Sequence, residues 1–123
     1  MTELEKKRTL LIQRQNDQFR KAMIQYTWET PDKKVEGQYV VAQCLNELDH
    51  GSKMLIVLEV FHFDKFTEDN DPHGEHDFGA FTYEGHKIFW KIDYYDTNYE
   101  MGSKDPSDLT ITRRILTMML ASE

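Results

Sequence analysis

The chain has 123 residues, of which 39% are hydrophobic and 30% charged, and its formal net charge is −7 at pH 7. This length and composition indicate one soluble globular domain, residues 1–123, and exclude a disordered or fibrous chain. No apolar run reaches the roughly 20 residues of a membrane span, the charged start is not a signal peptide, and the single Cys44 excludes an internal disulfide. We therefore expect a cytoplasmic protein that does not enter a membrane.

The first segment, residues 4–26, has the spacing of a helix. Side chains suited to burial recur three, four or seven positions apart, which places them on one helical face. They are Leu4, Leu11, Gln15, Phe19, Ala22, Met23 and Tyr26. Residues 27–36 contain Pro31 and are expected to form a loop.

Strands are expected to follow this loop. The β-branched stretch 39–45 and the almost continuously apolar stretch 54–63 each predict a strand, joined by a turn at residues 49–52. Residues 78–83 and 87–94 flank Glu84-Gly85-His86 and predict a hairpin. Alternation in its second arm points four side chains to one face, namely Ile88, Trp90, Ile92 and Tyr94, of which Trp90 and Ile92 are expected in the core. The other face carries Phe89, Lys91, Asp93 and Tyr95, so Lys91 and Asp93 are expected to pair.

The C-terminal segment carries a helix-start signal. Asp105 is an N-cap candidate, Pro106 suits the first helical position and Asp108 suits the first turn. The buried face of this helix would comprise Leu109, Thr112, Ile115, Leu116 and Met119. The expected fold is α+β, an antiparallel sheet of about four strands with an N-terminal and a C-terminal helix packed on it. The apolar end of the last helix, residues 118–120, could contribute to a homodimer face.

The most unusual segment is the stretch 67–79, TEDNDPHGEHDFG, whose residues 67–77 we call the acidic loop. The stretch contains five carboxylates and two histidines but no lysine or arginine. Residues 59–105 carry twelve Asp and Glu against four Lys and Arg, whereas residues 1–34 carry eight Lys and Arg against five acids. The acidic middle opposes direct nucleic-acid binding and favours a basic partner.

One hypothesis for the acidic loop is a divalent metal site. The candidate ligands are His73 and His76, because imidazole beside carboxylates suits zinc, manganese or iron. The alternating Asp69, Asp71 and His73 resemble half of a calcium loop, but Ala80 stands where the closing acid should be, so calcium of that type is excluded. We favour no cofactor and keep the metal as an alternative.

A second hypothesis is acid/base catalysis. A histidine beside carboxylates can move protons near neutral pH, and the candidates are His76, Asp77 and Asp93. No obvious nucleophile accompanies them, because Cys44 is expected in a strand and the serines lie in turns or near chain ends. The alternative function is therefore a small metal-dependent or acid/base enzyme that uses the cluster His73, His76, Asp77 and Asp93.

The favoured hypothesis is a non-enzymatic recognition surface. Aromatic residues interleaved with acids suit an interface that binds a basic protein segment, such as that of a nucleic-acid-binding protein. The residues expected to bind are Asp69, Asp71, His73, Glu75, His76, Asp77, Lys91, Asp93, Tyr95 and Asp96. A third hypothesis is structural: the acids cap turns, Lys91 pairs with a carboxylate, and function lies elsewhere.

Several strings resemble the bacterial domain-of-unknown-function family DUF3768. They are Gln15 to Arg20, Phe63 to Phe81, Phe89 to Asp96, Gly102 to Pro106 and Thr112 to Ala121. The resemblance implies a small cytoplasmic product, often of a plasmid or other mobile element. It also implies an accessory or counter-defence role, of anti-CRISPR or anti-restriction type, such as inhibition of a host defence nuclease complex.

Overall fold

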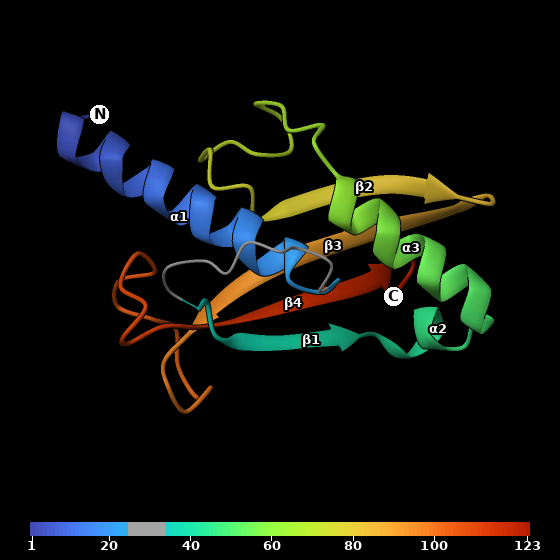
Figure 1. Cartoon of the computed structure of the whole chain (residues 1–123). Coiled ribbons are helices and arrows are strands. Elements are labelled where there is room, and N and C mark those ends of the chain that lie inside the picture. Colours follow the sequence, from blue (N-terminus) through green and yellow to red (C-terminus); the bar gives the residue numbers. More distant parts are fainter. Residues whose placement is uncertain (25–33) are drawn as a thin grey trace.

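A computed structural model shows a two-layer α+β fold and describes residues 1–24 and 34–123 (Figure 1). The elements in chain order are α1 (Glu3–Lys21), β1 (Gly37–Val41), α2 (Gln43–Asn46), α3 (His50–His62), β2 (Phe78–Tyr83), β3 (His86–Tyr95) and β4 (Arg113–Leu120). The expected end of the first helix near Tyr26 and most of the expected loop 27–36 lie outside the described residues. No helix in the described part of the chain is long and apolar enough to cross a membrane.

The four strands form one mixed sheet in the order β1-β4-β3-β2. The α+β class with a four-stranded sheet is therefore confirmed. β2 pairs antiparallel with β3, and β3 pairs antiparallel with β4, but β1 runs parallel to β4. The expectation of a purely antiparallel sheet was wrong, because β1 and β4 are far apart in sequence and need no tight turn between them.

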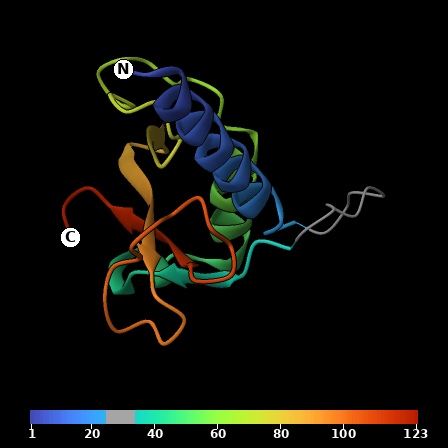
Figure 2. The same cartoon turned by 90° about the vertical axis from the view of Figure 1, so that its left-hand side faces the viewer.

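Both long helices pack on the same face of this sheet (Figure 2). The core between the layers contains Phe19 of α1, Ile56 and Val60 of α3, and Trp90 and Leu116 of the sheet, each at most 1% exposed. Among residues 1–24 and 34–123, no helix packs on the opposite face of the sheet. Trp90 and Ile92 are thus core residues, as the alternation of β3 predicts.

Residues 50–62 form helix α3, so the strand predicted for residues 54–63 was wrong. The Asp49 carboxylate accepts a hydrogen bond from the Ser52 amide at 3.0 Å and caps the helix, where the sequence suggested only a turn. Ser52, Ile56 and Val60 are buried at a spacing of four, whereas Leu55 remains 50% exposed. A continuous apolar run does not distinguish a strand from a helix.

The chain ends in strand β4, so the predicted C-terminal helix was also wrong. The Asp105 carboxylate accepts hydrogen bonds from the Ser107 amide and hydroxyl, and it stabilises an irregular turn where a helix was expected to begin. Arg114, Leu116 and Met118 are buried at a spacing of two. Met118 therefore belongs to the core, and no apolar helix end is present to form the predicted homodimer face.

Two further details of the sequence prediction were corrected. β1 ends at Val41, and Cys44 lies in the short helix α2 instead of in a strand. The buried face of α1 contains Ile12 and the polar residues Gln15, Asn16 and Arg20, together with Phe19, while Leu4 and Leu11 are exposed. Three polar residues on a buried helical face require partners, and these partners define the site described next.

Candidate functional site

The acidic loop turns around one buried carboxylate. Oδ1 of Asp71 accepts hydrogen bonds from the backbone amides of Glu75, at 3.0 Å, and His76, at 3.1 Å. The Asp71 side chain is only 5% exposed. These bonds hold His76 in a left-handed backbone conformation, with φ at 56°, which non-glycine residues rarely adopt.

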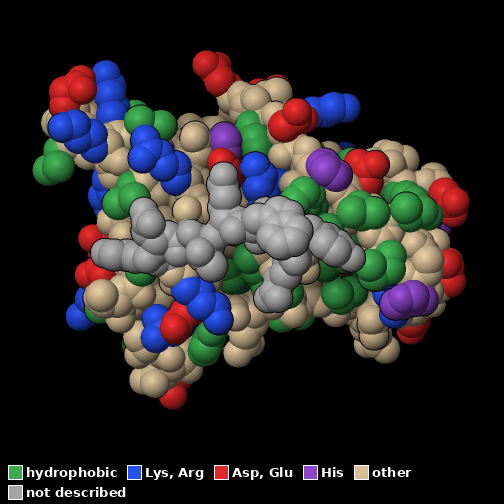
Figure 3. Space-filling model, in the orientation of Figure 1, with side chains coloured by type: hydrophobic (Ala, Val, Ile, Leu, Met, Phe, Trp, Pro, Cys, Tyr) green, Lys and Arg blue, Asp and Glu red, His purple; other side chains and the backbone are tan. Residues whose placement is uncertain are grey.

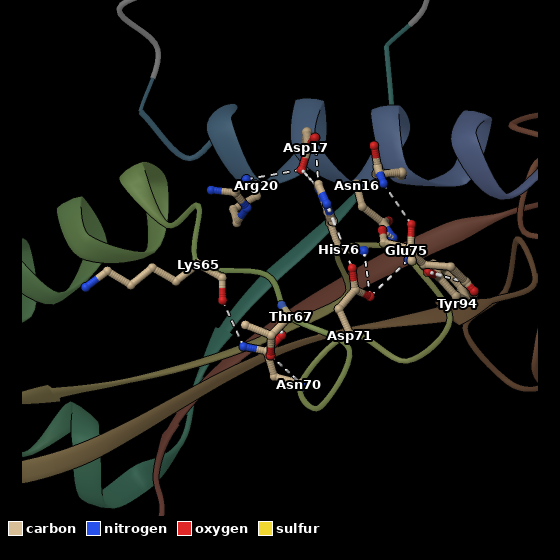
Figure 4. A network of polar contacts seen from close by, with 12 residues as sticks. Asn16, Asp17, Arg20, Lys65, Thr67, Asn70, Asp71, Glu75, His76 and Tyr94 are labelled. Atoms are coloured by element: carbon tan, nitrogen blue, oxygen red, sulfur yellow. Dashed lines mark hydrogen bonds and ion pairs between the residues drawn. The ribbon is translucent and has the colours of Figure 1, made fainter.

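The imidazole of His76 lies between two carboxylates (Figure 4). Its Nδ1 atom is 3.0 Å from Oδ1 of Asp17, a residue of α1, and its Nε2 atom is 3.8 Å from Oδ2 of Asp71. The ring of Phe66 stacks on the imidazole with 3.8 Å between centroids and 5° between planes. The imidazole thus has a carboxylate at each nitrogen and an aromatic ring against one face.

Arg20 extends this network from α1 to α3. Its guanidinium contacts Oδ1 of Asp17 at 3.1 Å and donates to the backbone carbonyls of Val60 and Phe61 at 2.8 Å. It also lies over the Trp90 ring, 5.4 Å from the centroid. Burial lowers the pKa of Arg20 from its usual value, while the hydrogen bond and the charge of Asp17 act in the opposite direction.

A second branch of the network joins α1 to the sheet. The Asn16 amide donates to the Glu75 carbonyl at 2.9 Å and to the Tyr94 hydroxyl at 2.7 Å, and that hydroxyl donates to the Glu75 carboxylate. The completely buried Arg114 donates to the side-chain oxygens of Asn16 and Gln15 at 2.7 and 2.9 Å. Burial raises the pKa of Tyr94 and lowers that of Arg114 to about 10.

Asp77 enters the sheet beside this network, and its carboxylate forms no ion pair with any residue that the structure describes. Its backbone carbonyl accepts a hydrogen bond from the Ile92 amide at 2.8 Å. Burial, followed by the nearby charges of Glu75 and Asp71, raises the pKa of its carboxyl above the usual value. The carboxylate is therefore held in an unfavourable environment at neutral pH.

The other end of the acidic loop is a tight turn that faces solvent. The Thr67 amide donates to the Asn70 side chain at 2.8 Å, and the Asn70 amide donates back to the Thr67 hydroxyl at 3.3 Å. Glu68 and Asp69 form the tip of this turn and are exposed, and His73 is also exposed further along the loop. The loop is thus fixed on α1 at one end and exposes charged side chains at its tip.

The remaining predicted binding residues lie outside the acidic loop. Lys91 and Asp93 form the expected pair, with Nζ and Oδ2 3.0 Å apart. With Tyr95 they belong to the sheet face opposite the helices, whereas the acidic loop is bonded to α1. Oδ1 of Asp96 accepts the amides of Asn98 and Glu100 and so stabilises its own turn.

The positions of the histidines and carboxylates bear on both the metal hypothesis and the acid/base hypothesis. No group of three or more His, Cys, Asp or Glu side chains suited to holding a metal ion occurs in residues 1–24 and 34–123. The pair of Asp17 and His76 has the geometry of an oriented imidazole. However, the far nitrogen of His76 faces Asp71, and no hydroxyl or thiol of the described residues hydrogen-bonds to the ring.

Four residues of this network were not among the site residues predicted from the sequence: Asn16, Asp17, Arg20 and Arg114. The available signal was the string from Gln15 to Arg20, in which polar side chains interrupt the expected apolar face of α1. Arg114 could be found only once β4 was known to be a strand, since alternation then directs it into the core.

Comparison with known families gives a match over most of the chain. The profile of the family described as protein of unknown function, DUF3768, matches residues 41–123. The matched span includes the acidic loop and strands β2, β3 and β4, while α1 and most of β1 precede it. No curated protein and no solved structure matches the chain.

Proposed function

The chain belongs to the DUF3768 family of proteins of unknown function, and we propose that it is a non-enzymatic interaction protein that binds a basic protein surface through the tip of its acidic loop. The supporting observation is that some side chains of that loop face inward and others face solvent. Asp71 and His76 are turned inward and fix the loop on α1, while Glu68 and Asp69 are turned outward on a hydrogen-bonded turn. Figure 3 shows acidic side chains projecting at the top of the molecule, where this loop lies.

A fixed charged loop suits recognition for two physical reasons. Preorganisation lowers the conformational entropy lost on binding. Carboxylates held together also accelerate the encounter with a basic surface, an effect that salt weakens. Nucleic-acid-binding proteins present such basic surfaces, so we propose a subunit of a host defence nuclease complex as the partner, with inhibition as the result.

The test of this proposal is a charge reversal confined to the tip. The double variant Glu68→Lys and Asp69→Lys and the wild type are each immobilised, and bound bacterial proteins are compared at about 50 mM and about 300 mM salt. We expect a basic partner that the wild type retains only at low salt and that the variant does not retain. Asp71 is unsuitable for this test because its substitution would release the loop itself.

The control is a double variant with the same change in net charge, Glu100→Lys and Glu84→Lys, at exposed positions of two other loops. It should retain the partner, since its tip is intact. Retention of the same proteins by the tip variant, or binding that salt does not weaken, would contradict the proposal.

The second candidate function is acid/base catalysis, which the 3.0 Å contact between Asp17 and His76 favours. In this reading Asp17 orients the imidazole, and Nε2 exchanges a proton with substrate after moving away from Asp71. Turnover of a simple ester or phosphoester that His76→Gln abolishes, and that the tip variant retains, would favour the enzyme over the interaction protein.

A further inference from the structure

The outer edge of strand β2 presents backbone groups that are free to bond. Among the described strands, β2 lies at the edge of the sheet and pairs with β3 alone. The Ile92 amide donates to the Asp77 carbonyl, and these residues are opposite each other in the antiparallel register. Along an antiparallel ladder, residues that hydrogen-bond the neighbouring strand alternate with residues that do not. Asp77 is bonded to β3, so Ala80 and Thr82, at odd-numbered separations from it, direct their amides and carbonyls away from β3.

This edge lacks two features that commonly protect an edge strand, charged residues and proline. Residues 78–83, with the sequence FGAFTY, contain no charged residue and no proline. Within the part of the chain that the structure describes, no segment other than β3 forms a hydrogen bond with the backbone of these residues. The edge is thus a template for a further strand.

A groove runs beside the same edge. It has a volume of about 310 Å³ and lies between Ala80 and Thr82 of β2 and the C-terminal end of α3, where Glu59 lines it. Asp64, which follows α3, lines it as well. A strand edge beside a helix is the arrangement in which extended peptides bind by strand addition, with backbone bonds to the edge and side chains in the groove.

The charges of the groove identify the occupant. Glu59 and Asp64 contribute two carboxylates, Lys65 contributes one ammonium group and His62 contributes an imidazole. All four side chains are exposed, and the carboxylates outnumber the ammonium group. We propose that an extended segment of a partner protein, with lysine or arginine at alternate positions, adds to the edge of β2 in this groove. A second copy of the chain fits less well, because an antiparallel pair of β2 strands would bring two acidic grooves together.

This inference goes beyond the proposed function because it concerns a different surface from the loop tip. The probe is a synthetic peptide of about seven residues, the length of one strand, that alternates valine with lysine and is blocked at both ends. A peptide with glutamate in place of lysine is the comparison. We expect the lysine peptide to bind at least about tenfold more tightly. Its binding should slow hydrogen exchange of the Ala80 and Thr82 amides.

Two variants test the two parts of the inference. Ala80→Pro removes an amide that faces the edge and leaves the ladder to β3 intact, and it should weaken the lysine peptide by about tenfold or more. Glu59→Lys, on the exposed side of α3, should reverse the preference between the peptides without affecting folding. Glu100→Lys makes the same change of charge elsewhere and should leave the preference unchanged.

Several outcomes would overturn the inference. One is equal binding of the two peptides, and another is binding that neither Ala80→Pro nor Glu59→Lys weakens. A third is self-association of the wild type, measured by sedimentation and abolished by Ala80→Pro. That result would mean that the edge binds a second copy of the chain. The loop-tip variant should bind the lysine peptide like the wild type, so a failure at the edge and a failure at the tip can be distinguished.

Discussion

One carboxylate oxygen of Asp17 contacts both the imidazole of His76, at 3.0 Å, and the guanidinium of Arg20, at 3.1 Å. His76 belongs to the acidic loop, and Arg20 bonds the carbonyls at the end of α3. One attachment of the loop to α1 therefore shares a group with the attachment of α1 to α3, while the Asn16 bond to the Glu75 carbonyl is a separate attachment of the loop. Removing that group should weaken both attachments together.

We expect Asp17→Asn to lower the free energy of unfolding by about 2 kcal/mol. The Arg20 side chain is 2% exposed, so the substitution leaves a buried cation without its ion-pair partner. The cost stays below that of a fully buried pair, because Asp17 is itself 30% exposed. Urea denaturation at neutral pH measures it. The control is Glu3→Gln, whose exposed pair with Lys6 should contribute less than about 0.5 kcal/mol. Equal effects of the two substitutions would contradict this account.

Asp71→Ala should release the acidic loop before it affects the rest of the fold. The substitution removes the acceptor of two backbone amides and leaves His76 in a strained conformation. We expect hydrogen exchange at the Glu75 and His76 amides to accelerate by at least about tenfold, which corresponds to about 1.4 kcal/mol. Amides of β3 should change much less. Asp69→Ala, at the exposed tip, is the control and should leave hydrogen exchange at the Glu75 and His76 amides slow. An equal acceleration of exchange in the Asp69→Ala variant would show that Asp71 has no special role.

The sequence predicted the hairpin well because its signals are local. Apolar and polar residues alternate along β3, and both Glu84 and Gly85 at the turn have positive φ values, as a tight hairpin requires. The pair of Lys91 and Asp93 follows from the same alternation. Each of these features depends on residues a few positions apart.

The errors arose where tertiary packing decides the structure. The run 54–63 is almost continuously apolar, so its period could not identify α3, and only the cap of Asp49 marks the helix start. Asp105 bonds Ser107 as an N-cap would bond a helix, although β4 follows. The parallel pairing of β1 with β4 leaves no signal in either strand.

The candidate site was predicted only in part for a related reason. Asp71 and His76 were predicted because acids and histidines are concentrated in one loop. The residues of α1 that bond this loop, Asn16 and Asp17, lie about sixty positions earlier in the chain. A buried polar network connects residues through space, and a single sequence records only that polar residues occupy an expected apolar face.

Asp77→Asn should stabilise the protein at neutral pH. The pKa of the Asp77 carboxyl is raised in the folded state by burial and by the charges of Glu75 and Asp71, so its ionised form opposes folding. The penalty is complete above the raised pKa, decreases as pH falls through it, and vanishes below the unfolded value near 4. We expect the free energy of unfolding to rise at pH 7, and we expect this gain to disappear at acidic pH. Denaturation at several pH values measures it, and a loss of stability at pH 7 would show that the carboxylate has a favourable partner.

Gly79→Ala should destabilise the fold by about 3 kcal/mol, because β2 contacts the core here without room for a methyl group. An added Cβ would overlap Nε1 of Trp90 and lie 2.8 Å from Cε1 of Phe63. Neither ring can move easily, since Trp90 is fully buried and the two rings pack edge to face 5.5 Å apart. The matched control is Gly102→Ala, whose new Cβ would be 3.9 Å from its nearest neighbour. In urea denaturation, the free energy of unfolding of that variant should be within about 0.5 kcal/mol of the wild-type value. Equal free energies of unfolding for the two variants would mean that β2 can shift away from Trp90. The edge that β2 offers to a partner strand would then not be fixed in place.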